Sequence, residues 1–271
     1  MSEDFSFTKF ANNDFYKKQN ENLVDLADLT NGTKVIDLAC ATGGVTKIIA
    51  QKMTGAKKSI IFAIDHSASA LKIAKEDLNS IKTSAINFIQ SQVENVSDSV
   101  KENVDAVFFC NAIHYINDKD TLIDNISKTL KPGGKLAFNT SFYEGSHPQD
   151  SLLFYKKWMF KAAKILKRNY GMFPKKENKV ESRIHLTPEE YQEILERKGF
   201  ILQKQNVARV MVPISGWLDI SEFKDFIEGA MPGVPLKEAS MALQTAVRET
   251  FKDLAIETVP RNWLEIVAIK K

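Results

Sequence analysis

Cysteine is scarce in this sequence: the 271 residues include two, Cys40 and Cys110, each in or beside an apolar stretch. No CxxC pair and no HxxxH pair occurs, so the sequence indicates neither a disulfide framework nor a zinc site, and we expect no metal. No apolar run approaches the roughly 18 residues that a membrane-spanning helix needs, so we expect no transmembrane segment. The opening segment MSEDFSFTKFANNDF lacks the basic and apolar regions of a signal peptide, which favours a cytoplasmic location.

The sequence also has no large excess of positive or negative charge. The 37 Lys and Arg residues nearly balance the 34 Asp and Glu residues, for a net charge of +3, which is too small to indicate a nucleic-acid partner. No P-loop and no G-x-S-x-G segment is present, which argues against an NTPase and a hydrolase. The length suits one large domain, or a core domain with an insertion.

Short apolar runs alternate with helical segments over the first two-thirds of the chain. Helical spacing predicts one helix over 42–53 and a second that Ser67 caps. Strands separated by such helices form a parallel sheet with right-handed crossovers. Two later strands, 200–213 and 263–270, are expected to pair antiparallel at one edge. The five earlier strands are predicted at 34–39, 59–64, 85–90, 104–110 and 135–142.

The predicted fold class is therefore α/β: a doubly wound, mostly parallel seven-stranded sheet with an antiparallel edge hairpin and a helical lid insertion. Residues 1–30 are expected to form an N-terminal helical cover. Residues 31–145 and 184–271 are expected to form the α/β core. We expect the helical lid elements, 146–183 and 216–256, to be inserted in that core and to sit above the active face.

The turn after the first strand carries the strongest chemical signal. The segment DLACATGG runs from Asp37 to Gly44 and joins the strand to a helix. A tight turn there lets the backbone approach a ligand, and the helix N-terminus favours negative charge. Asp65 ends the second strand, 28 residues after Asp37, where an acidic side chain can accept both hydroxyls of a ribose. The turn alone would also fit an ordinary connection, but the whole order of elements indicates a nucleotide-type cofactor.

At this point the sequence resembles the class I methyltransferases, in the branch that modifies small molecules. The matching segments are VIDLACATGG, IFAIDHS, FIQSQVENV, VDAVFFCNAIHYIND and LKPGGKLAF, in the family's order over residues 34–142. The resemblance implies S-adenosyl-L-methionine as the cofactor. It places Asp37, Ala39, Thr42 and Gly43 at the methionine part, Asp65 at the ribose, His66, Gln92 and Val93 at the adenine, Asn111 and Ala112 beneath the sulfonium, and Tyr16 in a cover over the cofactor.

The sequence departs from the family's pattern in two places. Ala39 and Ala41 stand where the turn usually carries glycine. Alanine is tolerated there if both residues keep a negative φ, although its methyl group narrows the space for the cofactor backbone. Gln92 stands where aspartate is usual. Its side-chain carbonyl can still accept a hydrogen bond from the adenine amino group, and its amide can donate to a ring nitrogen.

A sulfonium makes its methyl group electrophilic, so the protein mainly has to align nucleophile, methyl carbon and sulfur. A base is needed only if the nucleophile must lose a proton during transfer. His114 follows the fourth strand and is the candidate catalytic residue, because imidazole titrates near neutral pH. Alternatively, His114 shapes the substrate floor or hydrogen-bonds the following loop. His147 and His185, in the lid region, either face the substrate or lie in exposed loops.

The first lid helix is predicted over 152–168 and is amphipathic. Its apolar face is expected to carry Leu152, Tyr155, Met159, Ala162 and Leu166. Three interpretations of its basic face remain open: a solvated lysine face, a funnel for an acidic or phosphorylated substrate, and a nucleic-acid or membrane surface. The basic residues are Lys156, Lys157, Lys161, Lys164, Lys167 and Arg168, extended by Lys175, Lys176 and Lys179.

A second lid helix is predicted over 219–230, and we assign to it the apolar side chains of Trp217, Phe223, Phe226 and Ile227. These side chains either pack the lid onto the sheet or line an apolar pocket for a small organic acceptor. The chain is therefore expected to methylate a small molecule at oxygen, nitrogen or carbon, with no nucleic-acid partner. Two alternatives remain: a methyltransferase of RNA or protein that docks through the lysine-rich helix, and a catalytically silent cofactor-binding protein. The oligomeric state is left open.

Overall fold

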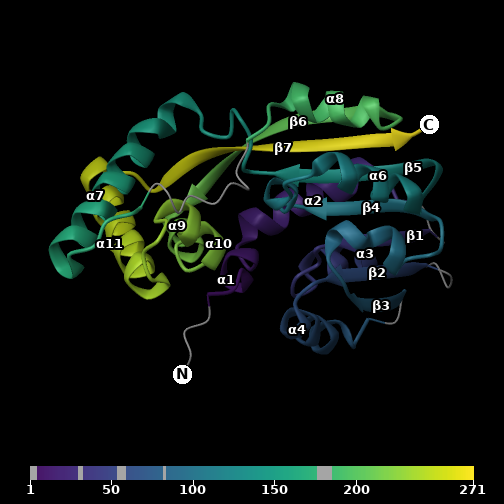
Figure 1. The fold of residues 1–271 in the computed structure, drawn as a ribbon, viewed down its shortest axis with the longest axis horizontal. Coiled ribbons are helices and arrows are strands. Elements are labelled where there is room, and N and C mark those ends of the chain that lie inside the picture. The colour runs from purple at the N-terminus through teal and green to yellow at the C-terminus, as the bar shows by residue number, and fades with distance from the viewer. Residues whose placement is uncertain (1–4, 30–32, 54–58, 82–83, 176–184) are drawn as a thin grey trace. The chain divides into compact units, whose positions relative to one another are not determined.

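The computed structural model describes residues 5–29, 33–53, 59–81, 84–175 and 185–271, and Figure 1 shows its ribbon. The chain divides into two compact units. The helical unit comprises Met1–Tyr16, Gly145–Arg183 and Arg209–Asn262, and the sheet unit comprises Lys17–Glu144, Ile184–Ala208 and Trp263–Lys271. No helix in the described ranges has the length and apolar character needed to cross a membrane.

One seven-stranded sheet organises the sheet unit, in the order β3-β2-β1-β4-β5-β7-β6. The first five strands pair in parallel, whereas β7 runs antiparallel to β5. The predicted α/β fold, mostly parallel with an antiparallel edge, is confirmed. The strands are β1 Lys34–Leu38, β2 Ile60–Asp65, β3 Ala85–Gln90, β4 Val104–Cys110, β5 Leu130–Thr140, β6 Phe200–Pro213 and β7 Thr258–Lys270.

Apolar side chains project from both faces of the sheet and are buried against helices. On one face Ile36 and Val107 join a core that contains Leu122 of α6 and Leu195 of α8. On the other face Val35 joins a core built with α2 and α3. Burial on both faces is what parallel strands with helical crossovers require. The helices concerned are α2 Asp14–Ala27, α3 Gly44–Lys52, α4 Ala68–Leu78, α5 Val96–Ser99, α6 Lys119–Thr129 and α8 Pro188–Arg197.

The helical unit is built around a long helix pair, α7 (Leu152–Tyr170) and α11 (Leu236–Leu254), which lie side by side in Figure 1. The indole Nε1 of Trp158 donates to the carbonyl oxygen of Leu243 at 3.0 Å, so the two helices are joined by a buried hydrogen bond as well as by packing. The shorter helices of this unit are α1 Thr8–Ala11, α9 Ile214–Ile220 and α10 Lys224–Ala230.

One predicted helix of the helical unit was wrong. The residues expected to form one helix over 219–230 belong to two: α9 ends at Ile220, where Ser221 Oγ donates to the carbonyl of Trp217 at 2.6 Å, and α10 begins at Lys224. Trp217 thus belongs to α9, and Phe223 directly precedes α10. The aromatic residues pack within the unit itself: Trp158 lies 5.6 Å from both Trp217 and Phe226, between ring centroids.

The predicted apolar face of α7 was also partly wrong. Ala162 and Leu166 are buried as expected, but Leu152 is exposed and the stripe is completed by Phe154, Trp158 and Ile165. Phe154 and Trp158 are buried because they pack in the aromatic core shared with α9 and α11. In the sheet unit, the fifth strand begins at Leu130 instead of 135, since Leu130 already pairs with Val104 across a bulge.

Candidate functional site

The carboxyl ends of the parallel strands lie side by side in the sheet unit. Leu38 of β1 is in register with Ile64 of β2, and Asp65 is in register with Gln90 of β3. The pairing continues past the end of β1, where the Cys40 N–H donates to the Ile64 carbonyl at 2.9 Å. The turns that follow these strands therefore meet at one edge, where ligands of such sheets bind.

The turn between β1 and α3 has three residues in the left-handed region. The φ angles are +59° at Ala39, +47° at Ala41 and +84° at Gly43. The negative φ under which alanine would replace glycine without strain is therefore not found at either alanine. For a residue with a Cβ, this conformation costs roughly 1–2 kcal/mol. Strain of this kind is typical of functional sites, where the surrounding structure maintains the strained conformation. The two alanines thus follow the path that glycine would follow there.

Gly43 has a packing reason as well as a conformational one. A Cβ on this residue would come within 2.8 Å of Leu78 Cδ1 and 3.1 Å of Ala74 Cβ on α4. The start of α3 therefore approaches α4 so closely that only glycine fits without a shift. Thr42, just before it, is half-buried.

Asp65 connects the β1–α3 turn to the start of α4. One carboxylate oxygen accepts a hydrogen bond from the Ala41 N–H at 2.9 Å, and the other accepts from the Ser67 N–H at 2.8 Å. Only 5% of the residue is exposed. Each oxygen of a carboxylate has a second acceptor position, so the side chain can still receive two donors. Ser67 caps α4 as predicted, accepting from the Ala70 N–H.

Asp37 lies within β1, below the turn, and is fully buried. Thr46 Oγ1 of α3 donates to its carboxylate at 2.5 Å. Burial raises the pKa of Asp37 to about 7, against the lowering effect of the Thr46 hydrogen bond and with a smaller increase from the charge of Asp65. The carboxyl group therefore changes protonation near neutral pH in the ligand-free protein.

The predicted adenine-side residues lie at the ends of β2 and β3. Gln92 is exposed and precedes the short helix η1 (Val93–Asn95), of which Val93 is buried. His66 is exposed, with Nδ1 3.5 Å from a carboxylate oxygen of Asp65. Gln90, which sequence reasoning missed, donates from Nε2 to the His66 carbonyl at 3.2 Å. This hydrogen bond joins the end of β3 to the residue that follows β2.

Asn111 directly follows β4 and forms several hydrogen bonds with the end of β5. Its backbone is left-handed, with φ of +49°, a conformation that asparagine tolerates better than most residues. Its side-chain oxygen accepts from both the N–H and the hydroxyl of Ser141, at 2.9 and 3.1 Å, and its N–H donates to Asn139 Oδ1 at 2.9 Å. Ala112, half-buried, continues the same segment.

His114 lies in the short helix η2 (Ile113–Tyr115) and is 1% exposed. Its Nδ1 is hydrogen-bonded to Thr140 Oγ1 at 3.0 Å. The imidazole also packs against two rings, with centroid distances of 4.1 Å to Tyr115 and 4.5 Å to Phe142. The side chain is therefore fixed in position by β5 and by its aromatic neighbours.

Three other predicted residues lie at different places. Tyr16 belongs to the helical unit, where its ring packs against Phe10 at 5.3 Å, and its contact with the cofactor stays a prediction, as does the position of the lid over the active face. His147 also belongs to the helical unit; it is half-buried and hydrogen-bonded to Arg261 at 2.5 Å. His185 is half-buried in the sheet unit.

A row of hydrogen-bonded polar side chains crosses the sheet and was not predicted from the sequence. Asn139 Nδ2 donates to Asn20 Oδ1 of α2 at 3.0 Å, and Asn139 is in register with Glu265 of β7. Glu265 is 1% exposed, accepts from Asn206 Nδ2 at 2.8 Å and has a pKa raised by burial. The available signal was a polar residue inside an apolar strand, as in KLAFNTSF and WLEIVAIK.

Neither thiol nor metal chemistry is indicated at this edge of the sheet. Cys40 and Cys110 are buried free thiols, and burial raises the pKa of each well above its usual range, so both remain protonated and unreactive. Within the described ranges, no group of three or more His, Cys, Asp or Glu side chains is placed to share a metal ion.

Comparison with known sequences gives one family match and several relatives. The model of a methyltransferase-domain family matches residues 29–199. A carboxy-S-adenosyl-L-methionine synthase of Shewanella amazonensis is 34% identical over 116 residues, covering 41% of this chain and 46% of that protein. A mitochondrial ubiquinone biosynthesis O-methyltransferase of Dictyostelium discoideum is 30% identical over 117 residues, covering 40% and 35%. The matched region thus spans less than half the length of either relative.

Solved structures share the fold at low sequence identity. A phosphoethanolamine N-methyltransferase of Haemonchus contortus, in complex with phosphomonomethylethanolamine and S-adenosylhomocysteine, has a TM-score of 0.57 at 19% identity, covering 98% of this chain and 56% of that one. The cyclopropane synthase MmaA2 of Mycobacterium tuberculosis has a TM-score of 0.58 at 11% identity, covering 94% and 84%.

Proposed function

The chain belongs to the methyltransferase-domain family, class I type, whose cofactor is S-adenosyl-L-methionine, and from this premise we propose that it methylates a small organic molecule at oxygen, nitrogen or carbon. The relatives support a small acceptor, since they include enzymes named for ubiquinone biosynthesis and for phosphoethanolamine N-methylation.

The observation that carries the proposal is the geometry of Asp65. Its carboxylate is held by the N–H groups of Ala41 and Ser67, each of which uses one acceptor position of one oxygen. The remaining positions suit two vicinal hydroxyls, which is the donor pair that a ribose offers. The left-handed alanines also fit the cofactor, because they give the turn the path of glycine and add only a methyl group.

The other residues around the strand ends would complete the cofactor site. Bound there, S-adenosyl-L-methionine supplies an electrophilic methyl group on a neutral leaving group. We assign Asp37, Ala39, Thr42 and Gly43 to its methionine part, His66, Gln92 and Val93 to its adenine, Asn111 and Ala112 to the region beneath the sulfonium, and Tyr16 to the cover. The cationic amino group of the methionine part would favour the ionised form of the Asp37 carboxyl.

The role that best suits His114 is to shape the floor of the acceptor site. Its buried imidazole is anchored to Thr140 and packed against Tyr115 and Phe142. A rigid floor aligns the nucleophile with the methyl carbon and sulfur, and such alignment supplies much of the acceleration of a displacement of this kind. A proton acceptor at His114 would be needed only for an acceptor that is protonated at the moment of transfer.

The test is an acceptor screen with S-adenosyl-L-methionine labelled in its methyl group. Pools of small phenols, amines, carboxylic acids and enolisable ketones are incubated with the full chain, beside pools of total RNA and of protein. We expect label in a small-molecule pool, lost in Asp65→Ala. Labelling of RNA or protein alone would refute the small-molecule proposal while leaving methyl transfer intact, and absence of label in every pool, with cofactor bound, would refute methyl transfer.

A further inference from the structure

The outer face of α7 has an unusual composition for a surface helix. The 19 residues of α7 include five lysines and one arginine and no acidic residue. Its inward stripe, Phe154, Trp158, Ala162 and Ile165, is buried in the core of the helical unit. A helix that already buries one apolar stripe normally presents only polar side chains on the other side.

Two large apolar side chains nevertheless occupy the centre of the outer face. Phe160 is 70% exposed and Leu153 is 55% exposed. They are two helical turns apart, so they lie on the same line along the helix. At 3.6 residues per turn, Lys156 and Lys167 fall on one side of this line and Lys157 and Lys164 on the other. The outer face of α7 is therefore an apolar ridge between two rows of lysine.

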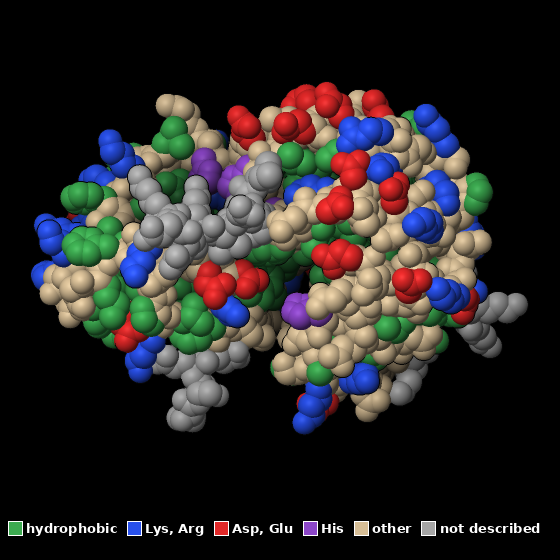
Figure 2. All heavy atoms as spheres, in the orientation of Figure 1, with side chains coloured by type: hydrophobic (Ala, Val, Ile, Leu, Met, Phe, Trp, Pro, Cys, Tyr) green, Lys and Arg blue, Asp and Glu red, His purple; other side chains and the backbone are tan. Residues whose placement is uncertain are grey.

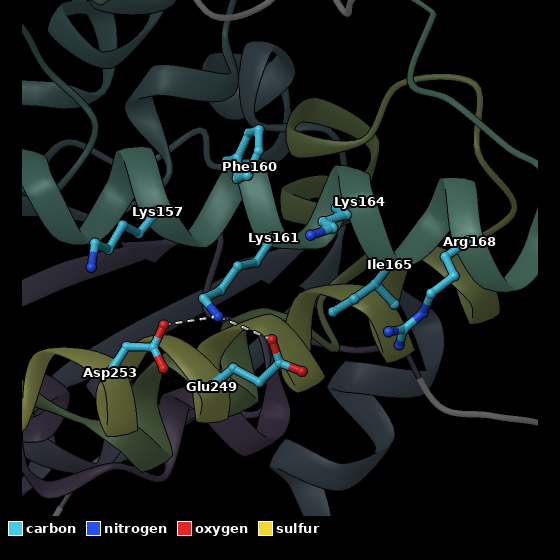
Figure 3. Close-up of a pocket in the computed structure, with 8 residues that line it drawn as sticks. All are labelled: Lys157, Phe160, Lys161, Lys164, Ile165, Arg168, Glu249 and Asp253. Carbon is cyan, nitrogen blue, oxygen red and sulfur yellow. Dashed lines mark hydrogen bonds and ion pairs between the residues drawn. The ribbon is translucent and has the colours of Figure 1, made fainter.

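Figure 3 shows where part of this surface lies. Over α7 and α11, apolar and Lys or Arg side chains lie next to one another in Figure 2. Figure 3 shows Phe160 on the side of α7 away from α11, while Lys161 points down to α11 and contacts Glu249 and Asp253, at 3.2 and 3.0 Å. Those two carboxylates thus neutralise Lys161, which lies off the ridge.

The apolar surface extends beyond the end of α7. Phe173 is exposed and lies under the Lys167 ammonium, 5.6 Å from its ring centroid. A groove of about 320 Å³ lies beside α7; Lys157, Lys164 and Arg168 line its α7 side together with Ile165, and Glu249 and Asp253 of α11 line it as well. Lysine stems pack along apolar surface while their ammonium groups reach outward, so the ridge and its two rows of lysine can present hydrocarbon and positive charge to one plane.

We propose that the outer face of α7 docks on the surface of an anionic lipid bilayer, with Leu153 and Phe160 in the boundary between headgroups and acyl chains and the lysines at the lipid phosphates. Charge complementarity selects this occupant, and the exposed apolar ridge requires hydrocarbon on the other side. A small anionic substrate would satisfy the lysines but leave Phe160 in water. The inference concerns the helical unit alone and is independent of methyl transfer.

The first experiment is sedimentation of the full chain with vesicles. Equimolar phosphatidylcholine and phosphatidylglycerol are compared with phosphatidylcholine alone, at low and high salt. We expect binding to the anionic vesicles, weakened by salt because the lysine contribution is screened. Absence of binding to anionic vesicles at low salt would overturn the proposal.

Two double variants separate the apolar and the charged contributions. Leu153→Ser with Phe160→Ser should lower vesicle partitioning by about tenfold or more, since both side chains lose burial in the acyl boundary. Lys156→Glu with Lys164→Glu should abolish it. The matched controls are exposed residues of the sheet unit: Ile201→Ser for the apolar change, and Lys101→Glu with Lys128→Glu for the same change in net charge. Unchanged partitioning of the serine variant would show electrostatic adsorption alone and contradict the proposal.

A fluorescent reporter tests insertion without weakening the surface. Trp158, Trp217 and Trp263 are buried, so a tryptophan introduced by Phe160→Trp dominates any change caused by vesicles. We expect its emission to shift to the blue and to be quenched by brominated acyl chains. A shift with RNA or inorganic phosphate but none with vesicles would assign the face to those ligands. A concentration-dependent dimer that the serine variant abolishes would assign it to a second copy of the chain.

Discussion

The carboxylate of Asp65 accepts a hydrogen bond from the backbone N–H of Ala41 at 2.9 Å, so the end of β2 fixes the turn that follows β1. The same carboxylate accepts from the N–H of Ser67, at the start of α4. Two strand–helix connections are thus held by a single side chain. The strain at Ala41, with φ of +47°, is sustained by this contact.

Replacing Ala41 by glycine should relieve that strain. We expect Ala41→Gly to raise the free energy of unfolding by up to about 1 kcal/mol, the relief of the left-handed conformation being partly offset by the greater entropy of glycine in the unfolded chain. Urea denaturation measures the change. Ala163→Gly, within α7, is the control and should lower stability by about 1 kcal/mol. Equal losses in both variants would show that Ala41 is not strained.

The buried Asp37 should make stability depend on pH. Its pKa is raised from 3.8 to about 7, so the folded state holds a proton that the unfolded state releases. Stability contributed by this group is therefore present below about pH 4 and is lost as the pH rises to about 7, with a slope of up to about 1.4 kcal/mol per pH unit.

Asp37→Asn is the matched variant, because an amide keeps the size and can still accept from Thr46. Urea denaturation of the ligand-free protein from pH 4 to pH 8 should give a stability difference, variant minus wild type, that grows with pH up to about pH 7. A difference that stays constant over this range would mean that Asp37 is ionised throughout, which would contradict its raised pKa.

The role of His114 can be tested once an acceptor is known. His114→Gln keeps hydrogen bonding to Thr140 but cannot act as a base near pH 7, and we expect its kcat to stay within about tenfold of wild type with the pH profile intact. His114→Ala should mainly raise the KM of the acceptor. A loss of about 10²-fold or more in kcat of the glutamine variant, together with loss of the pH step, would establish His114 as the base.

Much of the fold was predictable because strands and helices alternate with strong periodicity. Strands 85–90, 104–110 and 200–213 match the structure at both ends. The aromatic face of α7 was not predictable in detail, because Leu152 with Met159 and Phe154 with Trp158 both lie at helical spacing. Only the packing against α9 and α11 selects the stripe of Phe154.

The candidate site was predictable in position but not in conformation. The order of strand, turn, helix, strand and acid places Asp65 beside the turn, as the structure has it. The left-handed alanines were missed because local preference favours a negative φ, and only the tertiary contact from Asp65 overrides it. Glu265 was missed since a single buried acid within an apolar strand has no local signal of its partner, Asn206, on a different strand.

The most direct test of the central claim is a calorimetric titration of wild type, Asp65→Ala and Asp77→Ala with S-adenosylhomocysteine. Asp77 is an exposed residue of α4 and serves as the control. We predict binding by wild type and Asp77→Ala, and a loss of at least about tenfold in Asp65→Ala, because each charge-assisted hydrogen bond to the ribose contributes about 1.5–3 kcal/mol. Affinity of Asp65→Ala within about twofold of wild type would contradict the assigned cofactor site.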